Sequence, residues 1–132
     1  MKRYTVEVNE HQLRLIAQCV EDLNRFYSGQ MGLSNTANIL DTKRKVMLQE
    51  ELDELKAIVT PDIHDDIHDG YYGWSGAGCG DEIQRKFLAE SYYLYREIYH
   101  QLVNPDDTWN VYNGETLRCA DSGEPIIVKE VK

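Results

Sequence analysis

The stretch from Asp81 to Val103 most constrains the fold, because its apolar residues recur at the spacing of an α-helix. Steps of three and four residues place these side chains on one side of a helix. They form two neighbouring stripes, Leu88, Tyr92, Tyr95, Tyr99 and Leu102 beside Ile83, Phe87, Leu94 and Ile98. An apolar surface this wide predicts a helix that packs on more than one side.

A helix is also predicted between Asn9 and Ser28, because the sequence has a start signal at one end and a stop signal at the other. Asn9 can cap the free N–H groups of the first turn, and Gln12 lies three residues on, as in a capping box. Gly29 can adopt the left-handed conformation that ends many helices. The segment between them has one apolar stripe, formed by Leu13, Ile16, Val20, Leu23 and Tyr27.

A further helix is predicted from near Thr36 to the residue before Pro61. The intervening segment after the first helix, residues 31–36, has the composition of a loop. The buried side of this helix is marked by Leu48, Leu52, Leu55 and Val59. Charged residues fill the other faces, so we expect a surface helix with one side against the core.

Short strands are predicted at both ends of the chain. Residues 3–8 alternate β-favouring and polar side chains, and residues 126–128 form a short apolar run. Asn113-Gly114, between residues 109–112 and 115–119, best fits a tight hairpin turn. We therefore predict a single α+β domain over residues 1–132, mainly α. Its three principal helices would pack with a small antiparallel sheet built from the N-terminal strand and the C-terminal hairpin.

The densest polar chemistry lies in residues 60–70. Thr60 is a good N-cap and Pro61 suits a first helical turn, which predicts a short helix here. On that helix His64 and His68 share a face, and two histidines at this spacing can bind one metal ion. Aspartate follows the first histidine, however, where zinc peptidases need glutamate. The pattern favours a solvated polar face, and the alternative is a metal site on the two histidines.

A run of carboxylates on the helix before this tract suggests a second metal chemistry. Glu50, Glu51 and Glu54 fit E-E-x-x-E, which resembles the first half of the magnesium-binding signature of MazG-type nucleotide pyrophosphohydrolases. In that all-α family a second helix supplies E-x-x-D, and the carboxylates hold Mg²⁺ on the nucleotide phosphates. This chain offers D-x-x-D instead, for example at Asp66 and Asp69. The departure favours an exposed acidic face.

The segment 70–80 combines glycines with aromatic residues. Its glycine spacing fits neither a phosphate-binding loop nor a dinucleotide fingerprint. Tyr71, Tyr72 and Trp74 are therefore the candidate binding residues, because long irregular loops are often functional. In the alternative, these rings pack the loop onto the core.

The charge balance argues against direct nucleic-acid binding. Asp and Glu total 23 against 14 Lys and Arg, giving a net charge of −9. The one basic cluster, residues 43–45, has acidic neighbours, so no phosphate-binding face is expected. No window approaches the roughly 18 apolar residues of a membrane span. Three separated cysteines without a C-x-x-C pair suggest free thiols, and we expect a cytoplasmic protein.

Three parts of the chain together resemble a group of small phage and prophage proteins of unknown function. Residues 10–16 and 24–30 resemble the opening helix of that group, which ends in a Tyr/Phe-Ser…Gly-Gln pattern. Residues 92–102 resemble its Tyr-x-x-Tyr-x-x-Ile-x-His-x-Leu helix, and residues 123–126 its closing Glu-Pro-hydrophobic strand. The resemblance implies a phage-derived gene, an α-rich fold and the host cell cytoplasm. It implies no activity.

These observations favour a non-catalytic phage- or prophage-derived accessory protein that binds another macromolecule, either a protein partner or a second copy of itself. The wide apolar surface of residues 81–103 and the incomplete catalytic sets motivate this prediction, and no cofactor is expected. The alternative is a metal-dependent hydrolase, using Mg or Zn, such as a nucleotide pyrophosphohydrolase. Its divalent ion would bind Glu50, Glu51, Glu54, Asp66 and Asp69, or His64 and His68.

Overall fold

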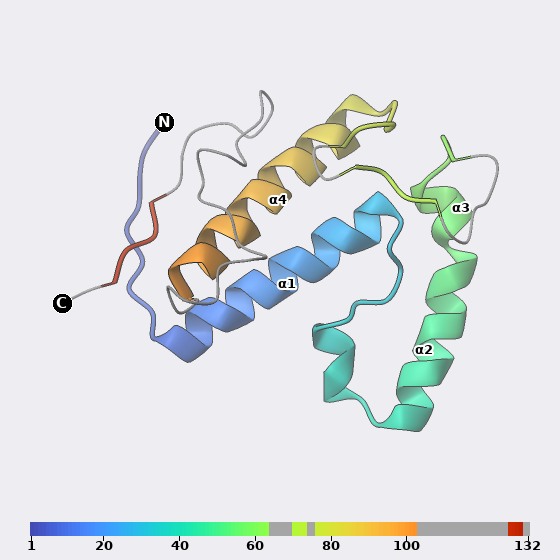
Figure 1. The fold of residues 1–132 in the computed structure, drawn as a ribbon, viewed down its shortest axis with the longest axis horizontal. Helices are drawn as coiled ribbons and strands as arrows, with labels where there is room; N and C mark the ends of the chain where they lie inside the picture. The colour runs from blue at the N-terminus through green and yellow to red at the C-terminus, as the bar shows by residue number, and fades with distance from the viewer. Residues whose placement is uncertain (64–69, 74–75, 103–126, 131–132) are drawn as a thin grey trace.

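An antiparallel pair of long helices forms the body of the molecule (Figure 1). The computed structural model of the protein describes residues 1–63, 70–73, 76–102 and 127–130. Helix α1 spans Glu10–Ser28 and helix α4 spans Glu82–Leu102. The two helices lie side by side and run in opposite directions (Figure 1). Both helices were predicted from the sequence, and both predictions are confirmed.

The ends of α1 form as the capping signals predict. Asn9 Oδ1 accepts the backbone N–H of Gln12 at 2.8 Å, and Gln12 Oε1 accepts the N–H of Asn9 at 3.0 Å. Gly29 follows the helix with a φ of 105°, in the left-handed region. A Cβ at this position would lie 2.8 Å from Thr60 Cγ2, so glycine is also required by the close approach of the next segment.

The second predicted helix is broken into three pieces, so its prediction as one element is wrong. The pieces are a short 3₁₀ turn at Thr36–Ile39, α2 at Thr42–Glu54 and α3 at Lys56–Val59. Leu40 adopts an extended conformation, and Asp41 then caps α2 by accepting the N–H of Arg44 at 2.9 Å. This bond and the Arg44 guanidinium lower the pKa of Asp41 below its usual value. Helix α2 mainly contacts α3 and projects from the α1–α4 pair (Figure 1).

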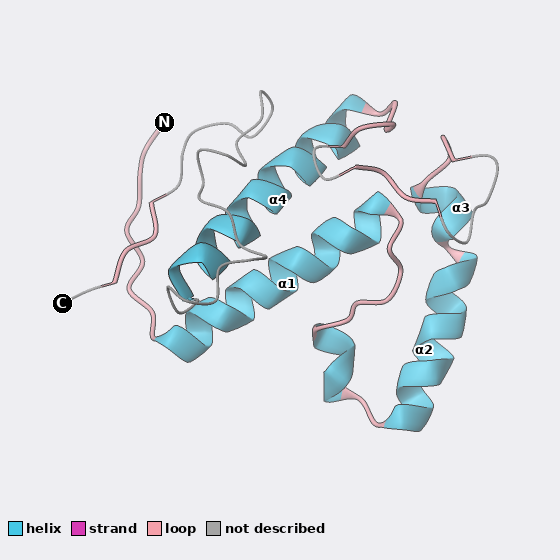
Figure 2. Ribbon diagram, in the orientation of Figure 1, coloured by secondary structure: helices cyan, strands magenta, loops and turns pink. Residues whose placement is uncertain are grey.

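The predicted antiparallel sheet is wrong for the part of the chain that the structure describes, which contains helices and no strand (Figure 2). The α+β class is therefore corrected to a mainly helical one. Tyr4 and Val6 are exposed, and residues 3–8 pair with no strand among the described residues. A short extended segment is stable only when a neighbouring strand pairs with it and a core covers one of its faces. The predicted hairpin at 109–119 lies outside the described residues.

The start of the polar tract is a turn rather than a helix, so the prediction of Thr60 as an N-cap is wrong. Thr60 instead follows α3, and its backbone N–H and Oγ1 both donate to the carbonyl of Lys56, at 2.8 and 2.9 Å. Asp62 Oδ2 then accepts the Tyr72 hydroxyl at 3.1 Å and the N–H of Gly80 at 2.8 Å. The tract thus starts as an anchor that joins two loop segments.

A small apolar core lies where this anchor meets α4. Tyr72, Cys79 and Leu88 are buried together, with Ile63 packed against them. Burial raises the pKa of Tyr72 to about 12 and also raises the pKa of the Cys79 thiol. The Cys79 thiol is therefore held protonated at neutral pH, which disfavours nucleophilic chemistry.

Candidate interaction surface

The apolar stripe that the sequence predicts on the first helix is partly left on the surface of the structure. Leu23, in the middle of the stripe, keeps 47% of its surface exposed. The exposed members of the stripe are Ile16, Leu23 and Tyr27. The buried positions of α1 hold small or polar side chains instead, namely Ala17, Asp22, Asn24 and Ser28. Helix α1 therefore presents much of its apolar side to solvent.

Buried hydrogen bonds join α1 to α4 on the inner side. Asn24 Nδ2 donates to the carbonyl of Leu88 at 2.8 Å and to Ser91 Oγ at 2.8 Å. Ser91 Oγ in turn donates to the carbonyl of Phe87 at 2.6 Å. Ala17 and Ser28, two small side chains, are also buried on α1. The pairing of these helices thus depends on polar contacts as well as on apolar packing.

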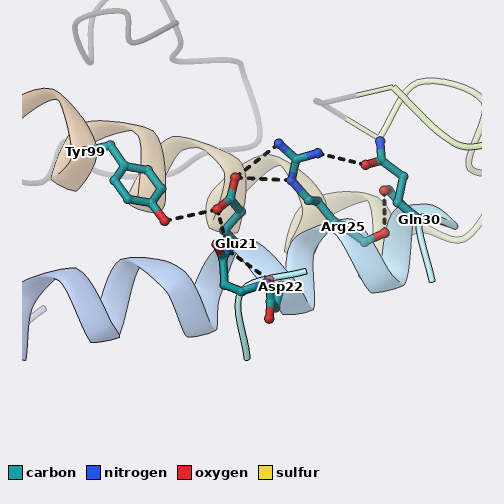
Figure 3. Close-up of polar contacts among 7 residues, drawn as sticks. Glu21, Asp22, Arg25, Gln30 and Tyr99 are labelled. Atoms are coloured by element: carbon teal, nitrogen blue, oxygen red, sulfur yellow. Dashed lines mark hydrogen bonds and ion pairs between the residues drawn. The ribbon is translucent and has the colours of Figure 1, made fainter. Parts of the chain in front are cut away.

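The Glu21 carboxylate connects three segments of the chain (Figure 3). Its Oε1 accepts the Tyr99 hydroxyl of α4 at 3.0 Å and Asn35 Nδ2 at 2.6 Å. Its Oε2 pairs with Arg25 on the next turn of α1, with Nε at 3.2 Å and Nη2 at 3.1 Å. Burial and the nearby Glu21 charge raise the pKa of Tyr99 well above its usual value. The hydroxyl therefore stays protonated and remains a donor at neutral pH.

The neighbouring carboxylate, Asp22, fixes the chain that follows α1. It is almost fully buried, and its oxygens accept the backbone N–H groups of Asn35 at 3.1 Å and Thr36 at 2.6 Å. A buried charge is tolerated only when hydrogen bonds replace its lost hydration. Asp22 therefore holds the 3₁₀ turn at Thr36–Ile39 against α1.

The exposed stripe of α1 continues onto α4. The rings of Tyr27 and Phe87 meet edge to face with centroids 5.5 Å apart, and Ile83 lies one turn from Phe87. Between the helices is an open groove of about 230 Å³, lined by Val20, Leu23, Phe87, Glu90, Ser91 and Leu94. We call this surface the outward apolar face and define it as Ile16, Val20, Leu23, Tyr27, Ile83, Phe87 and Leu94.

The outward apolar face carries little charge for so acidic a chain. Among the described residues that line its groove, Glu90 is the one ionisable group, although the whole chain carries a net charge of −9. Contiguous apolar surface of this kind marks interaction sites in proteins more often than it marks ordinary surface. The arrangement suits contact with another apolar surface.

The three aromatic residues predicted as a binding surface do not act as one group. Tyr71 is exposed, but Tyr72 is buried and its hydroxyl bonds to Asp62. Trp74 lies outside the described residues. Tyr72 is therefore corrected from a contact residue to a core residue, because its ring fills the space beside Leu88.

The residues predicted as alternative metal ligands fall into two groups. Glu50, Glu51 and Glu54 are all exposed on α2. The other members, His64, His68, Asp66 and Asp69, lie outside the described residues. Within residues 1–63, 70–73, 76–102 and 127–130, no group of three or more His, Cys, Asp or Glu side chains is placed to hold a metal ion. The metal-dependent alternative stays a prediction.

The sequence predictions missed the polar residues that orient α1. Glu21 and Arg25 stand four apart, the spacing of a helical ion pair, which was a usable signal. Asn24 and Ser28 are also four residues apart, next to the apolar stripe, and both are buried in the structure. Their polarity concealed that role, because polar helix positions usually face solvent.

No family model, curated protein or solved structure matches the chain. The resemblance to phage and prophage proteins therefore stays a prediction. In the described part of the chain, every helix is too short or too polar to span a bilayer.

Proposed function

We propose that this protein is a non-catalytic binding protein that acts through the outward apolar face, and that a second copy of the chain binds there. The observation that carries the proposal is the half-exposed stripe on two adjacent helices. Covering one large apolar side chain is worth about 1.5–3 kcal/mol. A surface with several such residues at helical spacing therefore favours association strongly.

The geometry of the α1–α4 pair favours a second copy over other partners. Two antiparallel helices that expose a common face complete a four-helix bundle when a twofold axis brings two copies together. The outward apolar face spans residues 16–27 of α1 and 83–94 of α4, so it is about 18 Å long. With helices 8–10 Å apart, it covers roughly 350 Å² of projected area. The ~800 Å² per partner of a standard stable interface is therefore reached only if the ends of α1 and α4 also contribute.

The charge distribution supports the same partner. In a twofold dimer each side contributes the same residues, so a charged face would oppose like charges across the interface. The outward apolar face avoids this problem, because Glu90 is the one ionisable residue among the described residues of its groove. A basic partner would find few carboxylates to pair with there.

The proposal includes an accessory role in a phage or prophage only on the strength of the sequence resemblance. The alternative hydrolase reading rests on Glu50, Glu51 and Glu54 alone among the described residues, and these are ordinary exposed positions on α2. No geometric observation favours that alternative over the binding role.

Sedimentation velocity over a wide range of protein concentration tests the proposal. We expect a reversible dimer for the wild type and a monomer for Leu23→Lys, because lysine would place charge in the apolar groove. Leu15→Lys is the matched control. Leu15 lies on the same helix with 51% exposure against 47% for Leu23, but it is outside the outward apolar face.

Two results would reject the proposal. A wild type that stays monomeric at every concentration would exclude a second copy as the partner. Equal dissociation by Leu15→Lys and Leu23→Lys would show that association does not use the outward apolar face. Circular dichroism of both variants confirms that they keep their helices.

A further inference from the structure

Helix α2 has a side that the rest of the chain leaves uncovered. The helix projects from the α1–α4 pair and mainly contacts α3, and Leu52 is its one buried residue (Figure 1). Exposed residues at helical spacing share the side opposite Leu52. We call this side the α2 face and define it as Lys43, Val46, Met47, Glu50 and Glu54. Val46 and Met47 are 54% and 56% exposed, so the face has an apolar centre between charged ends.

The charges of the α2 face do not help an isolated helix to form. Lys43 lies in the first turn, where the positive end of the helix dipole disfavours a cation, and Glu54 ends the last turn, where the negative end disfavours an anion. Glu50 and Glu54 are four residues apart, a spacing at which like charges repel. Within the described part of the chain, none of these three side chains has a hydrogen bond or ion pair. Their placement is therefore not explained by contacts within one chain.

The neighbouring cations of α2 are used inside the chain and do not belong to the face. Arg44 Nε pairs with Asp41 at 2.8 Å, and Lys45 Nζ donates to Asn38 Oδ1 at 2.8 Å. Both contacts fix the start of α2 after the 3₁₀ turn. Lys43 is therefore the cation that remains for an external contact on this side of the helix.

An antiparallel α2 from a second copy matches the charges of the face. A twofold axis perpendicular to the helix makes the pair antiparallel, and each contact then occurs twice. With the axis passing between Val46 and Met47, Val46 of one copy lies on Met47 of the other, and Lys43 lies opposite Glu50. The two helix dipoles also oppose each other, so each Lys43 approaches the negative half of the neighbouring helix.

Other partners match the face less well. A wholly apolar partner would remove water from Lys43 and Glu50 without pairing them. A basic partner would repel Lys43, and an acidic partner would repel Glu50 and Glu54. A partner with both charges in the reverse order matches the whole face, and α2 of a second copy has that order.

We propose that the α2 faces of separate copies pair in antiparallel orientation and join two dimers into a tetramer. This inference rests on the proposed function, because a dimer formed through the outward apolar face carries two α2 faces. The two surfaces have no residue in common, so both can be occupied at once. A single α2 contact is weak, because exposed ion pairs contribute little. Two contacts form together when two dimers meet, which strengthens the association of dimers over that of monomers.

Sedimentation velocity of charge-swapped variants tests the inference at physiological ionic strength, where charge repulsion is screened beyond about 8 Å. We expect a wild-type dimer that forms a tetramer at higher protein concentration. Lys43→Glu and Glu50→Lys each place like charges opposite one another, so each should raise the dissociation constant of the tetramer by roughly tenfold or more. The double variant Lys43→Glu/Glu50→Lys should restore the tetramer. The two residues are about 10 Å apart along one helix, so a contact within one chain does not explain such a restoration.

Lys2→Glu is the matched control, because Lys2 is an exposed lysine near the N-terminus, away from α2 (Figure 1). It changes the net charge as Lys43→Glu does and should leave the tetramer intact. Circular dichroism of each variant checks that the helices form.

The outcomes separate the two surfaces. A dimer that forms no larger species would overturn the α2 contact and leave the outward apolar face standing. Equal weakening of the tetramer by Lys2→Glu and Lys43→Glu, or no restoration in the double variant, would also overturn the α2 contact. A wild type that stays monomeric would reject the outward apolar face and, with it, the dimers that the tetramer requires.

Discussion

The inner and outer sides of α1 differ in a way that its sequence pattern does not suggest. On its buried side the helix has Ala17, Asn24 and Ser28, and Asn24 and Glu21 form hydrogen bonds to α4. Toward solvent it leaves Ile16, Leu23 and Tyr27 half exposed. An amphipathic helix in a lone domain normally has the reverse arrangement. The difference supports the proposal that a second copy of the chain covers the outer side.

The energetic terms on the two sides also differ in kind. A neutral buried hydrogen bond contributes about 0.5–1.5 kcal/mol, but loss of one partner exposes the full cost of desolvating the other. Removing a hydrogen-bonding side chain from the inner side is therefore expected to destabilise the fold, even though each bond contributes little to the free energy of unfolding. The outer side gains its stabilisation only when another surface covers it. Substitutions on the two sides should thus separate folding from association.

The largest effect on stability is expected at Leu88, a buried core residue of α4. This side chain has 0% exposure and packs with Tyr72 and Cys79. Leu88→Ala should lower the free energy of unfolding by about 3 kcal/mol, from lost burial and a residual cavity. Urea denaturation followed by circular dichroism measures the change. Leu88→Met, which keeps the volume, should cost under about 1.5 kcal/mol. Equal losses in both variants would contradict the packing of Leu88 against Tyr72 and Cys79.

A smaller effect on stability is expected at Asn24, whose side chain donates a hydrogen bond to the Leu88 carbonyl. Asn24→Ala removes a buried side chain that donates to the Leu88 carbonyl and to Ser91 Oγ, so both buried acceptors lose one hydrogen bond. We expect a loss of about 2 kcal/mol in the free energy of unfolding. A double-mutant cycle with Ser91→Ala should give a coupling energy of about 1 kcal/mol. A coupling near zero would show that the hydrogen bond between the two side chains contributes nothing.

Local signals in the sequence account for the elements that it predicts well. Asn9 with Gln12, and Gly29 after Ser28, form caps from residues that are neighbours along the chain. The wide stripe of residues 81–103 likewise contains its own periodicity. The break at Leu40 and Asp41 lies before Leu48, the first residue of the predicted apolar stripe, so the stripe gave no signal for it. The break at Leu55 was missed because the spacing of Leu52, Leu55 and Val59 continues across it. The predicted strand at 3–8 failed because a strand needs a partner that local pattern does not supply.

The candidate sites were less predictable because they depend on contacts between distant segments. Tyr71 and Tyr72 are adjacent in sequence, yet one is exposed and the other is buried beside Leu88. Arg25 near the end of α1 and Lys56 on α3 line one pocket, and no spacing rule connects those positions. The residues of the outward apolar face could be predicted from the sequence as parts of two apolar stripes. Their exposure to solvent could not be predicted. Apolar periodicity identifies the face of a helix that favours burial. It does not show whether another part of the same chain or a different molecule packs on that face.

The smallest effect on folding is expected at Ile83, on the same helix as Leu88. Ile83 belongs to the outward apolar face and is 83% exposed. Ile83→Ser should therefore change the free energy of unfolding of the dilute protein by no more than about 0.5 kcal/mol. The same change removes an apolar side chain from the proposed interface, so the dimer dissociation constant should rise by roughly tenfold. Denaturation of the dilute protein and sedimentation velocity measure the two quantities separately.

A large loss of stability in the dilute monomer would show that Ile83 contributes to the fold itself. The distinction between an inner side that folds the chain and an outer side that assembles it would then fail at this position.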